Sequence, residues 1–61
     1  MWVIRATKKI FGVEKDIYLT KPGEWTEDFE ECQKYETEQD ANHCRMMCHK
    51  FFTSIEVLKV D

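Results

Sequence analysis

The sequence predicts a small α+β domain, in which an N-terminal hairpin and a C-terminal strand form an antiparallel-type sheet packed on one main helix, with a short helix before it. Two segments rich in β-branched and aromatic residues lie near the N-terminus, and a third closes the chain. Between them runs a segment without Gly or Pro that has apolar residues at helical spacing. The 61 residues leave room for one domain, residues 1–61.

The N-terminal hairpin is predicted from strands at 2–7 and 16–20. In the first strand Trp2, Ile4 and Ala6 alternate with Val3, Arg5 and Thr7, and because Val3 makes this alternation imperfect, both faces are expected to be partly covered. Gly12 is the strongest turn signal between the strands, so the register of the hairpin stays open. The Lys-Pro-Gly-Glu stretch at 21–24 predicts a turn that ends the second strand.

The short helix is expected at 27–32. Thr26 is the expected N-cap, and the acids of the first turn suit the positive end of a helix dipole. Phe29 and Cys32 lie three residues apart and would share the inward face. Trp25, directly after the turn, is expected to cover the core.

The main helix is expected from about Glu38 to about Phe51. Thr37 and Asp40 form a capping pattern at its start, although Glu or Gln is preferred at the fourth position. At about 100° per residue one side of this helix collects the apolar residues and faces the sheet. These residues are Ala41, Cys44, Cys48, Phe51 and Phe52.

The closing strand, 54–60, is apolar on both sides. Ile55 and Val57 share one face, and Leu58 and Val60 share the other. With the helix on one face of the sheet, the other face is expected to be open. A homodimer or another partner would then cover it.

The stretch from Glu31 to Ala41 is similar to a pattern in many small phage and prophage proteins. In that pattern a small residue, two polar residues, an aromatic residue and an acid precede Thr-acid-x-acid-Ala at the start of a helix; here Cys32 stands where alanine is usual. The strand at 1–5 and the turn at 23–26 also resemble those proteins. The resemblance implies a ββαβ-type fold and a viral origin, but it assigns no functional residue to this sequence. Many proteins of that lifestyle bind and inhibit host proteins.

Catalytic signatures are missing from the sequence. Gly12 and Gly23 are the only glycines, which excludes a glycine-rich phosphate loop, and no CxxC pattern supports redox chemistry. Apolar runs of at most four residues cannot span a membrane. We therefore expect a non-enzymatic protein without a cofactor or a membrane partner. The start of the chain does not read as a signal peptide, so the cytoplasm, of the host cell if the protein is viral, is the expected location.

The cysteines Cys32, Cys44 and Cys48 are interpreted first as reduced core thiols. An odd count without a secretion signal argues against a disulfide framework. A zinc site would need a fourth ligand, because His43 and His49 point away from Cys44 and Cys48 on a regular helix. A metal-stabilised or disulfide-stabilised module stays an open alternative.

Charge is unevenly distributed along the chain. The net charge is -3, but residues 24–40 carry eight acids against one lysine, whereas residues 1–23 carry five basic residues against two acids. A dense acidic surface suits a basic partner, such as the nucleic-acid groove of an enzyme. In the sharpest form of this hypothesis, the acidic surface mimics DNA. The predicted partner-binding residues are Glu24, Trp25, Glu27, Asp28, Glu30, Glu31, Glu36 and Glu38.

The basic hairpin supports the alternative function, a small nucleic-acid-binding regulator. Its predicted contacts are Arg5, Lys8, Lys9, Lys15 and Lys21, with Phe11 and Tyr18 available for stacking. A sequence pI near 5.3 argues against it, because phosphate contacts dominate such affinities. Binding to a host protein is therefore the favoured prediction.

Overall fold

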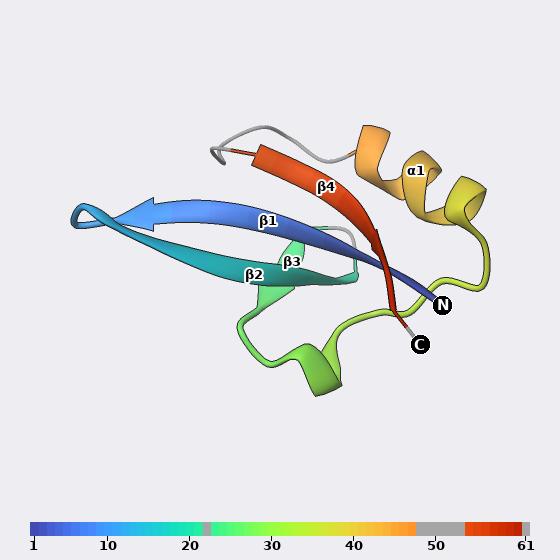
Figure 1. The fold of residues 1–61 in the computed structure, drawn as a ribbon, viewed down its shortest axis with the longest axis horizontal. Helices are drawn as coiled ribbons and strands as arrows, with labels where there is room; N and C mark the ends of the chain where they lie inside the picture. The colour runs from blue at the N-terminus through green and yellow to red at the C-terminus, as the bar shows by residue number, and fades with distance from the viewer. Residues whose placement is uncertain (22, 48–53, 61) are drawn as a thin grey trace.

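The computed structural model describes residues 1–21, 23–47 and 54–60 (Figure 1). These residues form strands β1 (Trp2–Ile10), β2 (Val13–Lys21), β3 (Glu24–Thr26) and β4 (Ser54–Lys59), the single 3-10 turn η1 (Phe29–Glu31) and helix α1 (Glu38–Met46). The sheet has the order β3-β2-β1-β4, and each neighbouring pair is antiparallel. This arrangement confirms the predicted α+β fold.

The main core lies between α1 and one face of the sheet. Ile4 on β1, Leu19 on β2 and Ala41 on α1 are the buried residues of this cluster. Strand pairing sets Ile4 beside Val57 and Ala6 beside Ile55 of β4, which accounts for the alternating apolar residues over this part of both strands. Partly buried side chains surround the cluster: Trp2, Trp25, Tyr35, Cys44, Ile55 and Val57. Trp25 therefore packs against the core as expected, although from a strand, β3, that the sequence did not predict.

The second face of the sheet is not open along its whole length. Val3 points to this face and is completely buried. Tyr18 lies on the same face, since it pairs with Arg5, and its ring meets Phe29 of η1 edge-on with the ring centroids 5.2 Å apart. The expectation of an uncovered face was wrong here because η1 folds back over it, on the side opposite α1 (Figure 1).

The short helix predicted at 27–32 is a single 3-10 turn. Its N-cap is Asp28 rather than Thr26, and the Asp28 carboxylate Oδ1 accepts a hydrogen bond from Glu30 N at 2.9 Å. Thr26 acts one step earlier, where its Oγ1 accepts from Asp28 N at 3.0 Å. Cys32 is buried, as predicted. The turn is closed by the backbone bond from Cys32 N to Phe29 O, three residues back, and it ends there because Cys32 is extended.

The segment 33–35 joins the two layers. Gln33 N donates to Leu19 O at 2.9 Å, and Trp2 and Tyr35 exchange two backbone hydrogen bonds of 2.8 and 2.7 Å. Tyr35 therefore pairs with Trp2 on β1, so this segment adds an isolated bridge to the three strand pairings of the sheet.

Helix α1 begins where the capping pattern predicts. Thr37 is the N-cap, and its Oγ1 accepts a hydrogen bond from Asp40 N at 3.1 Å. The described helix ends at Met46, with Met47 as the C-cap. The predicted continuation to Phe51, and the inward residues Cys48, Phe51 and Phe52, lie outside the described residues.

Removal of the Thr37 cap is expected to lower the free energy of unfolding by about 1 kcal/mol, because Thr37→Ala leaves an N–H group of the first helical turn without its side-chain acceptor. Urea unfolding followed by circular dichroism would measure the loss. Thr37→Ser is the matched control, since it keeps the hydroxyl and should remain close to wild type. Equal stability of the alanine and serine variants would contradict a capping role.

Candidate binding surfaces

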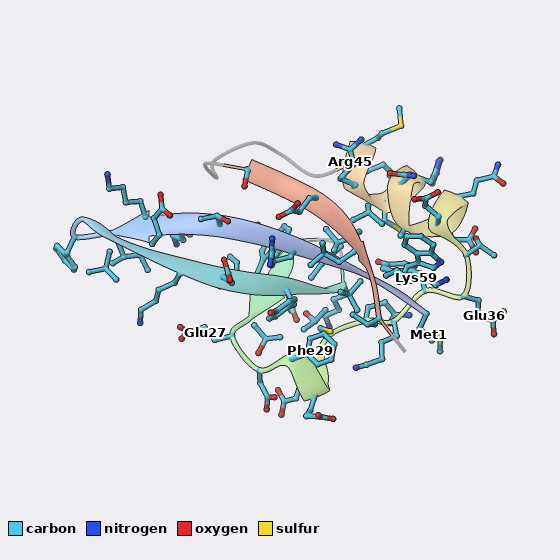
Figure 2. All side chains as sticks on the ribbon, viewed as in Figure 1. Met1, Glu27, Phe29, Glu36, Arg45 and Lys59 are labelled. Carbon is cyan, nitrogen blue, oxygen red and sulfur yellow. The ribbon has the colours of Figure 1, made fainter. Side chains whose placement is uncertain are left out.

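Every acid of the segment 24–40 is exposed to solvent. The structure places seven of these eight acids in two groups, and Glu24 lies apart from both at the start of β3. Glu27, Asp28, Glu30 and Glu31 surround η1 and are called the acidic turn here, whereas Glu36, Glu38 and Asp40 lie at the start of α1. Figure 2 shows Glu27 and Glu36 far apart, on either side of η1. The acidic segment therefore presents two charged patches rather than one.

Local hydrogen bonds fix the shape of the acidic turn. In addition to the bonds of Thr26 and Asp28, Glu31 N donates to Asp28 O at 3.1 Å and Cys32 N donates to Phe29 O at 3.3 Å. At the end of the turn the Lys34 ammonium donates to Phe29 O at 3.3 Å and Cys32 O at 3.4 Å. The four carboxylates are therefore held on a preformed loop.

Lys34 is the one base of the acidic segment, and it is half-buried. Its Nζ lies 5.1 Å from the centre of the Phe29 ring, in a cation–π contact. It thus stabilises η1 through these carbonyls and the Phe29 ring, and among the described residues it makes no salt bridge with the carboxylates. Sequence analysis missed this role, because only the folded turn brings its carbonyls to the lysine.

The aromatic residues of the acidic segment are placed inward. Trp25 and Tyr35 pack against the main core, and Phe29 packs on Tyr18. Of the predicted partner-binding residues, Trp25 is therefore half-buried, while the glutamates and Asp28 are exposed. Glu24 lies apart from the acidic turn at the start of β3, where its carboxylate lies 3.6 Å from Lys21 Nζ.

The predicted basic contacts do not form one patch. Arg5 donates a hydrogen bond to the Glu56 carboxylate, which raises the pKa of Arg5 above its usual range. Lys21 pairs with Glu24 as described, and Lys15 Nζ lies 3.5 Å from Glu27 Oε1. Lys8, Lys9 and Lys15 are brought together on the projecting end of the β1–β2 hairpin, away from Arg5 and Lys21.

The tip of that hairpin carries exposed apolar residues that the sequence analysis did not treat as one site. Ile10, Phe11 and Val13 surround the turn, and Phe11 has no contact that covers its ring, with an exposed fraction of 101%. The sequence signal that could have found this site is the group of apolar residues on both sides of Gly12, with lysines before and after it.

The described thiols lie in packed positions. Cys32 is buried beside Lys34, with the sulfur 3.9 Å from Nζ, and Cys44 packs against the main core. No three His, Cys, Asp or Glu side chains gather in a metal-binding arrangement within the described ranges. Cys48 and His49 lie outside those ranges, so the metal alternative is decided by elemental analysis of the purified protein.

Comparison with known proteins finds no matching family model, no matching curated protein and no matching solved structure. In the part of the chain with described coordinates, no helix has the length and apolar character needed to cross a bilayer.

Proposed function

We propose that this chain is a non-enzymatic binding module that modulates a partner protein by docking the acidic turn on a basic surface. The observation that carries the proposal is the fixed display of Glu27, Asp28, Glu30 and Glu31 around η1, outside the sheet. Backbone hydrogen bonds hold this loop in place, so little conformational entropy is lost when it binds.

The charge of the acidic turn favours a basic partner. Among the described residues, the acidic turn makes one salt bridge, between Lys15 and Glu27, and both side chains of that pair are largely exposed. An exposed pair of this kind contributes little stability. A basic protein surface would relieve the repulsion between neighbouring carboxylates and would steer association.

A surface that contacts nucleic acid is the basic partner with the best match in charge. We infer that the partner belongs to the nucleic-acid-binding enzymes of the cell in which this chain acts, a host cell if the chain is of phage type. Duplex DNA would then compete with the chain for the same partner, and both would bind more weakly at high salt.

Neutralising the acidic turn is expected to abolish partner capture while the protein stays folded. The variant Glu27→Gln, Asp28→Asn, Glu30→Gln and Glu31→Gln removes the four charges, and asparagine still caps the turn. The measurement is affinity capture from a cell extract by the immobilised chain, with elution by salt and by duplex DNA.

A matched pair of double variants distinguishes an effect of the acidic turn on partner capture from an effect of the net charge. Glu30→Gln with Glu31→Gln changes the charge by the same amount as Glu14→Gln with Asp16→Asn, but only the first pair lies on η1. We expect partner loss from the first pair and retention from the second. Equal capture by both variants, or capture that resists salt, would refute the proposed function.

A further inference from the structure

A projecting hairpin arm, residues 8–16, is the second unusual surface of the molecule. All nine residues are exposed, whereas the rest of both strands contributes to the packed sheet. The arm ends at one extreme of the long axis, which measures 34 Å (Figure 1). Ile10, Phe11 and Val13 form its tip, with exposed fractions of 37%, 101% and 57%. Isolated surface apolar residues are ordinary, but an apolar cluster at the end of a projection marks a binding surface.

Strand register gives the arm two different faces. Lys8 lies opposite Lys15, and Ile10 lies opposite Val13. Because paired residues share a face and positions two apart share a face, these four residues form one surface to which the two strands contribute no acid. Glu27, from outside the arm, reaches this surface in its exposed pair with Lys15. On the other face Lys9 lies opposite Glu14 and Thr7 lies opposite Asp16. One side of the arm is therefore basic behind an apolar tip, and the other side is mixed.

The tip is unfavourable for the isolated hairpin in two respects. Phe11 and Gly12 both have positive φ, 50° and 82°, in a two-residue turn of the I′ kind. Asparagine is the usual partner of glycine in such a turn, whereas a bulky side chain with positive φ is strained. The facing pair Lys8 and Lys15 also brings like charges together. Residues that destabilise their own local structure are concentrated at functional sites.

We propose that the hairpin arm docks on an anionic lipid surface. Ile10, Phe11 and Val13 enter the boundary between headgroups and acyl chains, while Lys8 and Lys15 meet the lipid phosphates. Two residues along a strand span about 7 Å, which sets the lysines behind the tip by a distance comparable to the depth of about 5–10 Å to which interfacial segments insert.

The one-sided charge of the arm favours a flat anionic surface over a nucleic-acid groove. In a groove, phosphates line both sides, so Glu14 and Asp16 would face negative charge. On a bilayer these two acids point away from the lipid while Lys8 faces it, and Lys15 faces it by exchanging its exposed pair with Glu27 for lipid phosphate. The earlier expectation of no membrane partner rested on the absence of a spanning segment, and an inserted hairpin tip needs no such segment.

The test is cosedimentation of the full chain with phosphatidylcholine vesicles, with and without about 30% phosphatidylserine. We expect binding to the anionic vesicles that weakens as salt rises, and little binding to the neutral ones. Phe11→Asn should reduce anionic-vesicle binding by about tenfold or more, since it removes the largest apolar side chain of the tip. The same variant should melt at or above the wild-type temperature, because asparagine tolerates the positive φ of the turn.

Lysine variants test the orientation without changing the turn. Lys8→Gln and Lys9→Gln remove the same charge from adjacent residues on opposite faces of the arm. We expect Lys8→Gln to weaken binding by about fivefold and Lys9→Gln by clearly less. Glu27→Gln should strengthen vesicle binding, because it frees Lys15, while it weakens capture through the acidic turn. The two proposals are therefore separable.

Three outcomes would overturn lipid docking: no binding to anionic vesicles, wild-type binding by Phe11→Asn, or equal losses from the two lysine variants. A duplex oligonucleotide in the same buffer serves as the competing probe. Oligonucleotide binding that depends on Phe11, without vesicle binding, would assign the arm to nucleic acid instead.

Discussion

Replacing Ile4 with alanine is expected to leave the chain largely unfolded at room temperature. Ile4 is completely buried at the centre of the cluster with Leu19 and Ala41. Truncation of a buried isoleucine costs about 2–5 kcal/mol through lost burial and the cavity that remains. The core of a domain this small supplies about 3–5 kcal/mol of net stability, so one such loss removes most of it.

Chemical unfolding followed by tryptophan fluorescence would measure the effect, since Trp2 and Trp25 pack against the same cluster. Ile4→Val is the matched control and should cost about 1 kcal/mol. An alanine variant that unfolds at the wild-type denaturant concentration would show that Ile4 is not part of the core.

Replacing Val3 with alanine is expected to cost about 2 kcal/mol, although Val3 points away from α1. Its side chain is completely buried on the second face, on the side where η1 packs through Phe29 and Tyr18. In a sheet with one open face, the same substitution would change stability by less than about 0.5 kcal/mol.

The matched control for Val3 is Thr7→Ala, on the same face of β1 but nearer the exposed arm. Thr7 is only half-buried, so its loss should be small. Comparable unfolding free energies for the Val3 and Thr7 variants would contradict the second covered layer.

The sheet and the helix start could be predicted because local sequence signals agree with the tertiary structure. Trp2, Ile4 and Ala6 alternate as a strand should, and Thr37 caps α1 through the expected hydrogen bond to Asp40. These features depend on residues close in sequence, and periodicity and capping chemistry describe such features well.

The length of the hairpin strands and the existence of β3 could not be predicted from local sequence signals. Lys8–Ile10 and Val13–Lys15 are charged or exposed, so they lack the pattern of burial, yet they pair with each other through the backbone. β3 has only three residues and exists because Trp25 packs against Leu19 across the strand pair. Tertiary contacts decide both features.

The candidate surfaces were predictable in charge but not in shape. Composition located the acids of residues 24–40, and the structure adds that they separate into the acidic turn and the start of α1. Whether Trp25 or Phe11 is exposed depends on the fold, since both are aromatic residues within two positions of a turn glycine. The apolar tip of the arm therefore emerged only from the structure.

The pairing of β1 with β4 has a consequence for synthesis on the ribosome. β1, like β2, has a neighbour on each side, but its second neighbour comes from the far end of the sequence, as Arg5 and Glu56 stand 51 positions apart. Until β4 emerges, β1 carries an unpaired edge next to its apolar side chains, which is a template for association between nascent chains. The lysines at the end of β1 then act as gatekeepers, because repulsion between chains opposes edge-to-edge pairing before the sheet is complete.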